Sequence, residues 1–259
     1  MIDVALTRHQ LRRADVAVVL DVLRATSTVT AALAGGYPTV LCAESVARAR
    51  SLRRPGRILA GECDCLMPDG FDQGNSPAEA FRRRGEELVL ATTNGAPAVL
   101  AATATASRVI LACLRNLEAV ITELNRLVDP MGGSEVQIVC SGTNGRVGLE
   151  DVYVAGRLAA RLPGPRTDAA LVAEAVGRGF PSTLQALEAS EDAEILRSVG
   201  LSDDVVWCAQ ESTLDVVPIV SSVDAGVCRV TSLCPNGLGR RDSPPPLGLG
   251  HNTSLEAIA

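Results

Sequence analysis

The chain has 259 residues, of which 47% are hydrophobic, and this is enough to bury a substantial core. Aromatic residues make up only 2%, so Ala, Val and Leu must build that core, as in parallel strands covered by Ala-rich helices. The net charge of −6 argues against nucleic-acid or membrane partners. The absence of Lys argues against Schiff-base chemistry, and the presence of only two His argues against a histidine-based metal centre.

Short apolar runs alternate with helical stretches along the chain. The runs predict buried strands at 16–20, 39–42, 57–60, 88–91, 108–112 and 136–140. Helices are predicted at 26–34, 45–52, 96–104, 117–127 and 149–162, and another begins at Pro77. Beyond residue 165 the pattern predicts helices at 168–178, 184–188 and 191–199, then strands near 216–220 and 227–231. This order predicts a three-layer α/β/α fold with a mostly parallel sheet and a C-terminal portion of helices and short strands.

The domain organisation is predicted to be simple. We expect one α/β domain over residues 1–241 and a Pro/Gly-rich tail over 242–259. A weak echo with an offset of roughly 70 residues, from Val19 to Val89, suggests two similar βαβα halves. The eight Cys are scattered, and neither a secretory signal nor a membrane-length apolar run is present, which predicts a reduced cytoplasmic protein.

Polar residues gather after the predicted strands, where ligands bind in open parallel sheets, and we expect these loops to share one sheet edge. Asp21, Arg24, Thr26 and Ser27 follow the first strand. A carboxylate, a guanidinium and hydroxyls at a helix start suit an anion or metal–anion site. The alternative is a helix cap beside a surface Arg.

A second polar region follows the strand at 57–60. Glu62 stands at the strand end, and the run from Asp72 to Asn75 precedes Ser76 and Pro77. A helix cap with proline in the first turn explains the last two residues, whereas the run before them has no such explanation.

Two further loops contain the sequence Thr-Asn-Gly. The first comprises Thr92, Thr93, Asn94 and Gly95, and the second is 142–145. Such turns offer backbone N–H groups and hydroxyls to a tetrahedral oxyanion, although ordinary turns have the same composition.

The second of these loops begins at a cysteine. Cys140 stands six positions before Arg146, a spacing that cysteine-dependent phosphatases use to place a thiolate under a phosphate. A metal-independent phosphatase with Cys140 as nucleophile is therefore an alternative. Glu150 and Asp151 open the next helix and add two carboxylates near the same loops.

Taken in order, these motifs resemble the 2-phosphosulfolactate phosphatase (ComB) family. The segments that carry the resemblance are 21–26, 61–62, 70–77, 92–95, 140–143 and 149–151, with Gly200, Asp203, Asp204, Val217 and Pro218. The resemblance implies a magnesium-dependent phosphatase that converts 2-phospho-3-sulfolactate to 3-sulfolactate and phosphate, a reaction of coenzyme M biosynthesis.

The chain departs from the family pattern at two positions. Cys63 and Pro97 stand where the family usually has Arg, so two cations that suit a phosphate or sulfonate are lost. A non-catalytic anion-binding relative is therefore a further alternative. The expected partner is a small phosphorylated acid, and the oligomeric state, a homo-oligomer included, stays open.

The resemblance and the loop positions together give a set of expected roles. Mg²⁺ is expected on Asp21, Glu62 and Asp151, and the catalytic residues are expected to be Asp21, Arg24 and Asp72. Phosphate binding is expected from Thr26, Ser27, Asn75, Ser76, Thr92, Thr93, Asn94, Gly95, Gly142 and Thr143.

Overall fold

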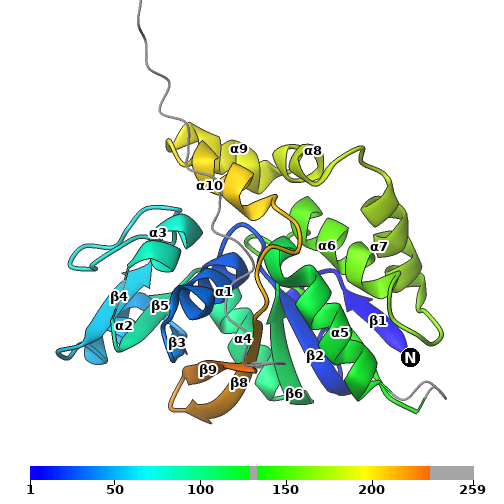
Figure 1. Ribbon diagram of the computed structural model, residues 1–259, viewed down its shortest axis with the longest axis horizontal. Coiled ribbons are helices and arrows are strands. Elements are labelled where there is room, and N and C mark those ends of the chain that lie inside the picture. The colour runs from blue at the N-terminus through cyan, green and yellow to red at the C-terminus, as the bar shows by residue number, and fades with distance from the viewer. Residues whose placement is uncertain (84, 129–132, 234–259) are drawn as a thin grey trace, which may run out of the picture.

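The computed structural model describes residues 1–83, 85–128 and 133–233, and the predicted tail at 242–259 lies outside them. A nine-stranded sheet runs through the described part in the order β1-β7-β2-β6-β8-β9-β3-β5-β4 (Figure 1). The strands are β1 (Ile2–Ala5), β2 (Ala14–Leu20), β3 (Val40–Ala43), β4 (Arg57–Gly61), β5 (Glu87–Ala91), β6 (Ala106–Ala112), β7 (Val136–Cys140), β8 (Val217–Asp224) and β9 (Val227–Leu233).

Helices connect and cover these strands. They are α1 (Ala25–Gly35), α2 (Val46–Ser51), α3 (Pro77–Arg82), α4 (Gly95–Thr103), α5 (Leu117–Leu127), α6 (Leu149–Ala159), α7 (Asp168–Arg178), α8 (Thr183–Glu188), α9 (Glu191–Ser198) and α10 (Ser202–Cys208), with short 3₁₀ turns at Arg8–Gln10 and Leu114–Asn116. The predicted α/β class with a mostly parallel sheet is confirmed.

The sheet consists of two parallel halves joined by an antiparallel hairpin. Strands β1, β7, β2 and β6 are parallel to one another, and so are β3, β5 and β4. The β8–β9 hairpin lies between β6 and β3 and pairs antiparallel with both. Three successive antiparallel pairings separate the halves, so their strands run in opposite directions.

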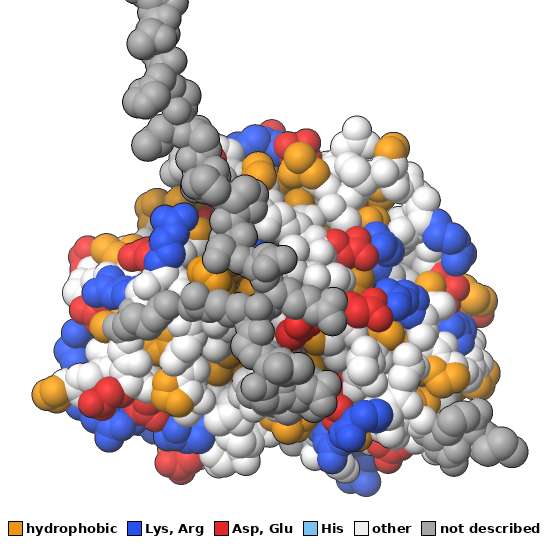
Figure 2. All heavy atoms as spheres, viewed as in Figure 1, with side chains coloured by type: hydrophobic (Ala, Val, Ile, Leu, Met, Phe, Trp, Pro, Cys, Tyr) orange, Lys and Arg blue, Asp and Glu red, His pale blue; other side chains and the backbone are white. Residues whose placement is uncertain are grey.

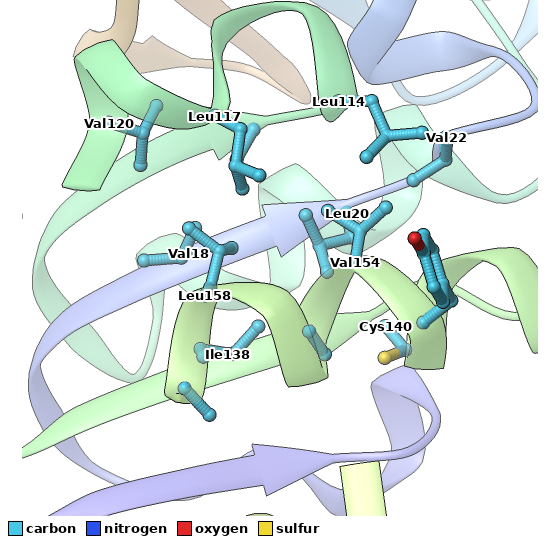
Figure 3. Packing of buried hydrophobic residues seen from close by; sticks show 14 of the residues in the cluster. Val18, Leu20, Val22, Leu114, Leu117, Val120, Ile138, Cys140, Val154 and Leu158 are labelled. Atoms are coloured by element: carbon cyan, nitrogen blue, oxygen red, sulfur yellow. The ribbon is translucent and has the colours of Figure 1, made fainter. Parts of the chain in front are cut away.

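Alternate residues of β2 lie in different hydrophobic clusters. Val18 and Leu20 belong to the cluster that contains Leu117 of α5 and Leu158 of α6 (Figure 3). Val19 belongs to a second cluster with residues of α1 and α4. A strand that is buried on both faces reads as a continuous apolar run, which is why the sequence identified it.

The internal echo has a spatial counterpart in the sheet order. Strands β2 and β5, and likewise β3 and β6, occupy matching positions on either side of the hairpin. The chain passes from β2 through α1 to β3 in the other half, and from β5 through α4 back to β6. The arrangement agrees with two similar units, and a duplication stays a prediction.

Two elements, β1 and α10, are absent from the sequence-based expectation. In β1 the charged Asp3 interrupts the apolar run, and distant residues satisfy its carboxylate. Arg12 Nε donates to it at 2.7 Å, Thr167 Oγ1 at 2.7 Å and Gln137 Nε2 at 2.8 Å. Tertiary partners of this kind leave no local signal in the sequence.

The surface shown in Figure 2 carries acidic and basic side chains interspersed over the part that the grey atoms leave visible. Among the residues that the structure describes, no helix is long and apolar enough to cross a bilayer.

Candidate functional site

Loops from both halves of the sheet surround a cavity of about 150 Å³. Its walls come from the segments after β2, β4, β5 and β7 and from α6 and α9. The lining residues are Asp21, Leu23, Arg24, Glu62, Asp64, Cys65, Asn75, Thr92, Thr93, Asn94, Gly142, Thr143, Asn144, Glu150, Asp151, Asp192, Ile195 and Leu196. The strand-end loops expected to lie together do meet at this cavity, although they come from two halves of the sheet that the β8–β9 hairpin separates.

Close packing of two loops explains the glycine that begins α4. A Cβ atom at Gly95 would lie 2.4 Å from the Cβ of Ala25 and 2.6 Å from Asp21 Oδ2. Only glycine lets the loop after β5 approach the loop after β2 this closely. Gly95 therefore shapes the wall beside Asp21.

The cavity is strongly acidic. Six of its lining residues are carboxylates, and Arg24 is the only basic residue among the described residues that line it. Burial together with the neighbouring Asp151 raises the pKa of Asp21 to about 8. Burial also raises the pKa of Asp151 to about 6, and it raises that of Glu150 well above its usual value.

Backbone hydrogen bonds fix the two central carboxylates. Asp21 Oδ1 accepts the N–H of Ala25 at 2.9 Å, at the start of α1. Asp151 Oδ1 accepts the N–H of Val22 at 2.9 Å, and its Oδ2 accepts the N–H of Gly142 at 3.1 Å. Asp151 thus ties the loop after β2 to the loop after β7.

Glu62 performs a similar task in the other half. Its Oε2 accepts the N–H of Cys65 at 3.0 Å, and its Oε1 accepts the N–H of Thr93 at 2.7 Å. The carboxylate therefore joins the loops after β4 and β5 and stands at the cavity wall, as the sequence predicted for a strand-end position.

Arg24 is held by a buried ion pair from a distant helix. Its Nη1 lies 2.7 Å from Asp204 Oδ2, and its Nη2 donates to the carbonyl oxygen of Cys65 at 3.2 Å. Ser76 Oγ donates to the other oxygen of Asp204 at 2.7 Å. A guanidinium has five N–H donors, so these two bonds leave others for a ligand.

Internal partners occupy several of the backbone N–H groups in the two Thr-Asn-Gly loops. The Thr143 N–H donates to Arg146 O at 3.0 Å, and the Asn144 N–H donates to Asn94 Oδ1 at 3.3 Å. Thr143 Oγ1 donates to Asp192 Oδ2 at 2.5 Å. These N–H groups are therefore not free to bind a ligand.

The structure brings most of the predicted site residues to the cavity. Those that line it are Asp21, Arg24, Glu62, Asn75, Thr92, Thr93, Asn94, Gly142, Thr143 and Asp151, whereas Thr26, Ser27, Asp72, Ser76 and Gly95 do not.

Two of the predicted hydroxyls support the backbone instead. Thr26 Oγ1 donates to Asp21 O at 3.0 Å, and Ser27 Oγ donates to Val22 O at 2.8 Å. They stabilise the loop that presents Asp21.

Asp72 has structural partners outside the cavity. Its Oδ2 accepts the N–H of Leu59 at 2.8 Å, and its Oδ1 lies 3.3 Å from Arg53 Nη1. Burial opposes ionisation, but these hydrogen bonds lower the pKa of Asp72 overall. The carboxylate thus fastens the segment before α3 to β4, and Asp72 has a structural role.

Cys140 is fully buried and does not line the cavity. Burial, with Asp151 and Glu150 nearby, raises the pKa of its thiol well above the usual value. A nucleophilic cysteine needs a thiolate within reach of the substrate. The structure therefore offers no support for the alternative with Cys140 as nucleophile.

The sequence did not single out Asp192 for the site. Asp192 lies in the first turn of α9, after the cap residue Ser190. An acidic first turn is common because it complements the helix dipole, so nothing local distinguishes Asp192. Only the docking of α9 over the loop after β7 brings it to the cavity.

Comparison with known proteins gives a consistent result. Residues 2–222 match the sequence model of a family described as 2-phosphosulpholactate phosphatase. A protein of Thermus thermophilus is 41% identical over 80% of this chain and 88% of its own length. One of Deinococcus radiodurans is 39% identical over 83% of this chain and 92% of its own length. Both relatives carry the name probable 2-phosphosulfolactate phosphatase.

Proposed function

Because the chain belongs to the 2-phosphosulfolactate phosphatase family, a family of phosphoric monoester hydrolases, we propose that it hydrolyses 2-phospho-3-sulfolactate to 3-sulfolactate and phosphate. We place the reaction in the cavity between the two halves of the sheet. The observation that carries this proposal is that six carboxylates and Arg24 line one cavity, mostly on loops that follow the carboxyl ends of the strands.

The acidic lining favours a magnesium-dependent reaction. The carboxylates of this lining that are ionised would repel a multiply charged anion unless a cation lay between them. Two buried oxygens at the cavity, Asn75 Oδ1 and Glu150 Oε2, have no hydrogen-bond partner among the described residues. An all-oxygen donor set of this kind suits Mg²⁺.

Within the described residues, no set of three or more His, Cys, Asp or Glu side chains is already arranged as a complete metal site. This is compatible with Mg²⁺, which binds through one or two carboxylates, water and substrate phosphate. We propose Asp21 and Asp151 as the main protein donors, with Glu62 and Glu150 beside them. When bound, the ion would neutralise charge on the phosphate.

The protein's own residues have complementary tasks in this proposal. Arg24, oriented by Asp204, donates to the phosphate oxygens. Asp151 holds the loops after β2 and β7 together, and this keeps Asp21 in position beside the phosphate. The hydroxyls of Thr92 and Thr93 add polar contacts along the wall.

Two arginines near the cavity are suited to the sulfonate. Arg8 Nη1 donates to the carbonyl oxygen of Asn94 at 3.5 Å, and Arg146 closes the turn that contains Thr143. The Arg146 guanidinium also lies 2.9 Å from Glu191 Oε2 of α9, and its remaining N–H groups are left for a ligand. We propose that they supply the positive charge that other family members place at the positions of Cys63 and Pro97.

The test is phosphate release from 2-phospho-3-sulfolactate and from the same acid without its sulfonate, with Mg²⁺ and with EDTA. We expect activity that requires Mg²⁺ and a drop of about 10²-fold or more in Asp21→Asn, the scale of losing one electrostatic stabiliser. Asp64→Asn is the matched control, since Asp64 lines the cavity but is exposed.

Three outcomes would contradict parts of the proposal. Release that survives both EDTA and Asp21→Asn would remove the carboxylate–metal site. An unchanged KM for the sulfonated acid in Arg8→Met and Arg146→Met would remove the sulfonate assignment. No release from either acid would favour the non-catalytic anion-binding alternative.

A further inference from the structure

We propose that a second cavity, between α2, β4 and the β8–β9 hairpin, binds a small doubly charged oxyanion such as inorganic phosphate or sulfate. The cavity has a volume of about 120 Å³. It is lined by Leu41, Arg48, Leu52, Arg57, Ser222, Asp224, Val227 and Arg229, none of which lines the acidic cavity. A cavity needs about 10–15 Å³ in this measure to hold one water molecule, so this one has room for a small anion.

The charge of this cavity is opposite to that of the acidic one. Arg48, Arg57 and Arg229 contribute three positive charges, and Asp224 contributes one negative charge. This excess stands out in a chain whose net charge is −6. Guanidinium groups also present paired N–H donors that match the geometry of phosphate and sulfate oxygens.

A buried carboxylate holds two of these arginines in place. Glu87 Oε2 accepts from Arg57 Nε at 2.8 Å, and its Oε1 accepts from Arg229 Nη1 at 2.8 Å. Arg54 Nη2 makes a third bond, at 2.7 Å. Three guanidiniums share one carboxylate, so the cluster is fixed and keeps a positive excess before any anion arrives.

Arg48 gives an independent indication of a ligand. Its Nε is buried and has no hydrogen-bond partner among the described residues, while its Nη1 donates to Ser51 Oγ at 3.2 Å. A buried donor on a charged group without an acceptor is unfavourable. Arg48 lines the cavity, so an oxyanion there would supply an acceptor for its guanidinium, and Ser222 adds a hydroxyl to the same lining.

The test is isothermal titration of inorganic phosphate into the full chain, in a low-chloride buffer with EDTA. We expect saturable binding that weakens about tenfold or more in Arg48→Met, which loses charge-assisted bonds but keeps an apolar stem. Arg50→Met is the matched control, because Arg50 is on the same helix, donates to Asp69 O and does not line the cavity.

A further variant tests the same cavity. Arg229→Met should also weaken binding, and it serves as a second probe if Arg48→Met unfolds, as judged by circular dichroism. Equal phosphate affinity in the wild type, Arg48→Met and Arg229→Met would overturn the proposal. Chloride competing as well as sulfate would also overturn it, since it would indicate unspecific attraction to positive charge.

Discussion

Removing the carboxylate of Asp204 should destabilise the protein strongly. Asp204 Oδ2 lies 2.7 Å from Arg24 Nη1, and the two side chains are only 6% and 3% exposed. Little water reaches either side chain, so Arg24 would remain as a largely buried charge without its ionic partner. Breaking such a pair from one side costs about 3–5 kcal/mol. We expect the free energy of unfolding of Asp204→Ala to fall by an amount in this range.

The assay is urea unfolding followed by circular dichroism, with the midpoint compared at unchanged slope. Asp203→Ala is the matched control, since Asp203 is exposed in the same first turn of α10. That change should cost no more than about 1 kcal/mol through the helix dipole. If Asp204→Ala and Asp203→Ala shift the midpoint equally, the buried pair is not formed and the reasoning fails.

Three other predictions concern pH and catalysis. Burial opposes the ionisation of Glu87, but hydrogen bonds from arginines lower its pKa from 4.5 to about 2. The stability that the ionised Glu87 gives the protein should therefore be lost as the pH falls from 4.5 to about 2. Over this pH range the urea midpoint should fall less in Glu87→Gln than in the wild type. In Glu86→Gln, where the side chain is exposed, it should fall as in the wild type. Burial raises the pKa of Asp21 to about 8 and that of Asp151 to about 6, so without Mg²⁺ the protein should lose stability as the pH rises from 3.8 through about 8. Mg²⁺ should reduce this loss, and identical melting profiles with and without it would contradict the metal site. Cys140→Ser should keep its phosphate release, since a buried thiol outside the cavity takes no part in it; loss of release from the folded variant would restore the cysteine alternative.

The sequence predicted most of the fold because the strands are buried on both faces. For β7, α5 and α7 the predicted bounds coincide with the observed ones. The direction of the two halves was not predictable, because it depends on where the β8–β9 hairpin inserts. Periodicity reports which face of a strand is buried but not which strand lies beside it.

The candidate site was predictable where it follows directly from a strand end. Asp21 and Glu62 stand immediately after apolar runs and line the cavity as expected. Asp192 and Asp204 come from α9 and α10, and only tertiary docking brings these helices to the site. Asp72 lies in a polar run that looked functional in the sequence, but its carboxylate anchors a loop by accepting the N–H of Leu59.

The position of the β8–β9 hairpin has a consequence for how the protein folds. The hairpin is the last pair of strands along the described chain, and it pairs Val40 with Val230, two residues far apart in sequence. Contacts at such separation form slowly, because a long loop must close first. Until they form, β6 and β3 each present an open edge that can pair with another chain. A nascent chain of this protein is thus open to edge-to-edge aggregation until this hairpin has paired with β6 and β3.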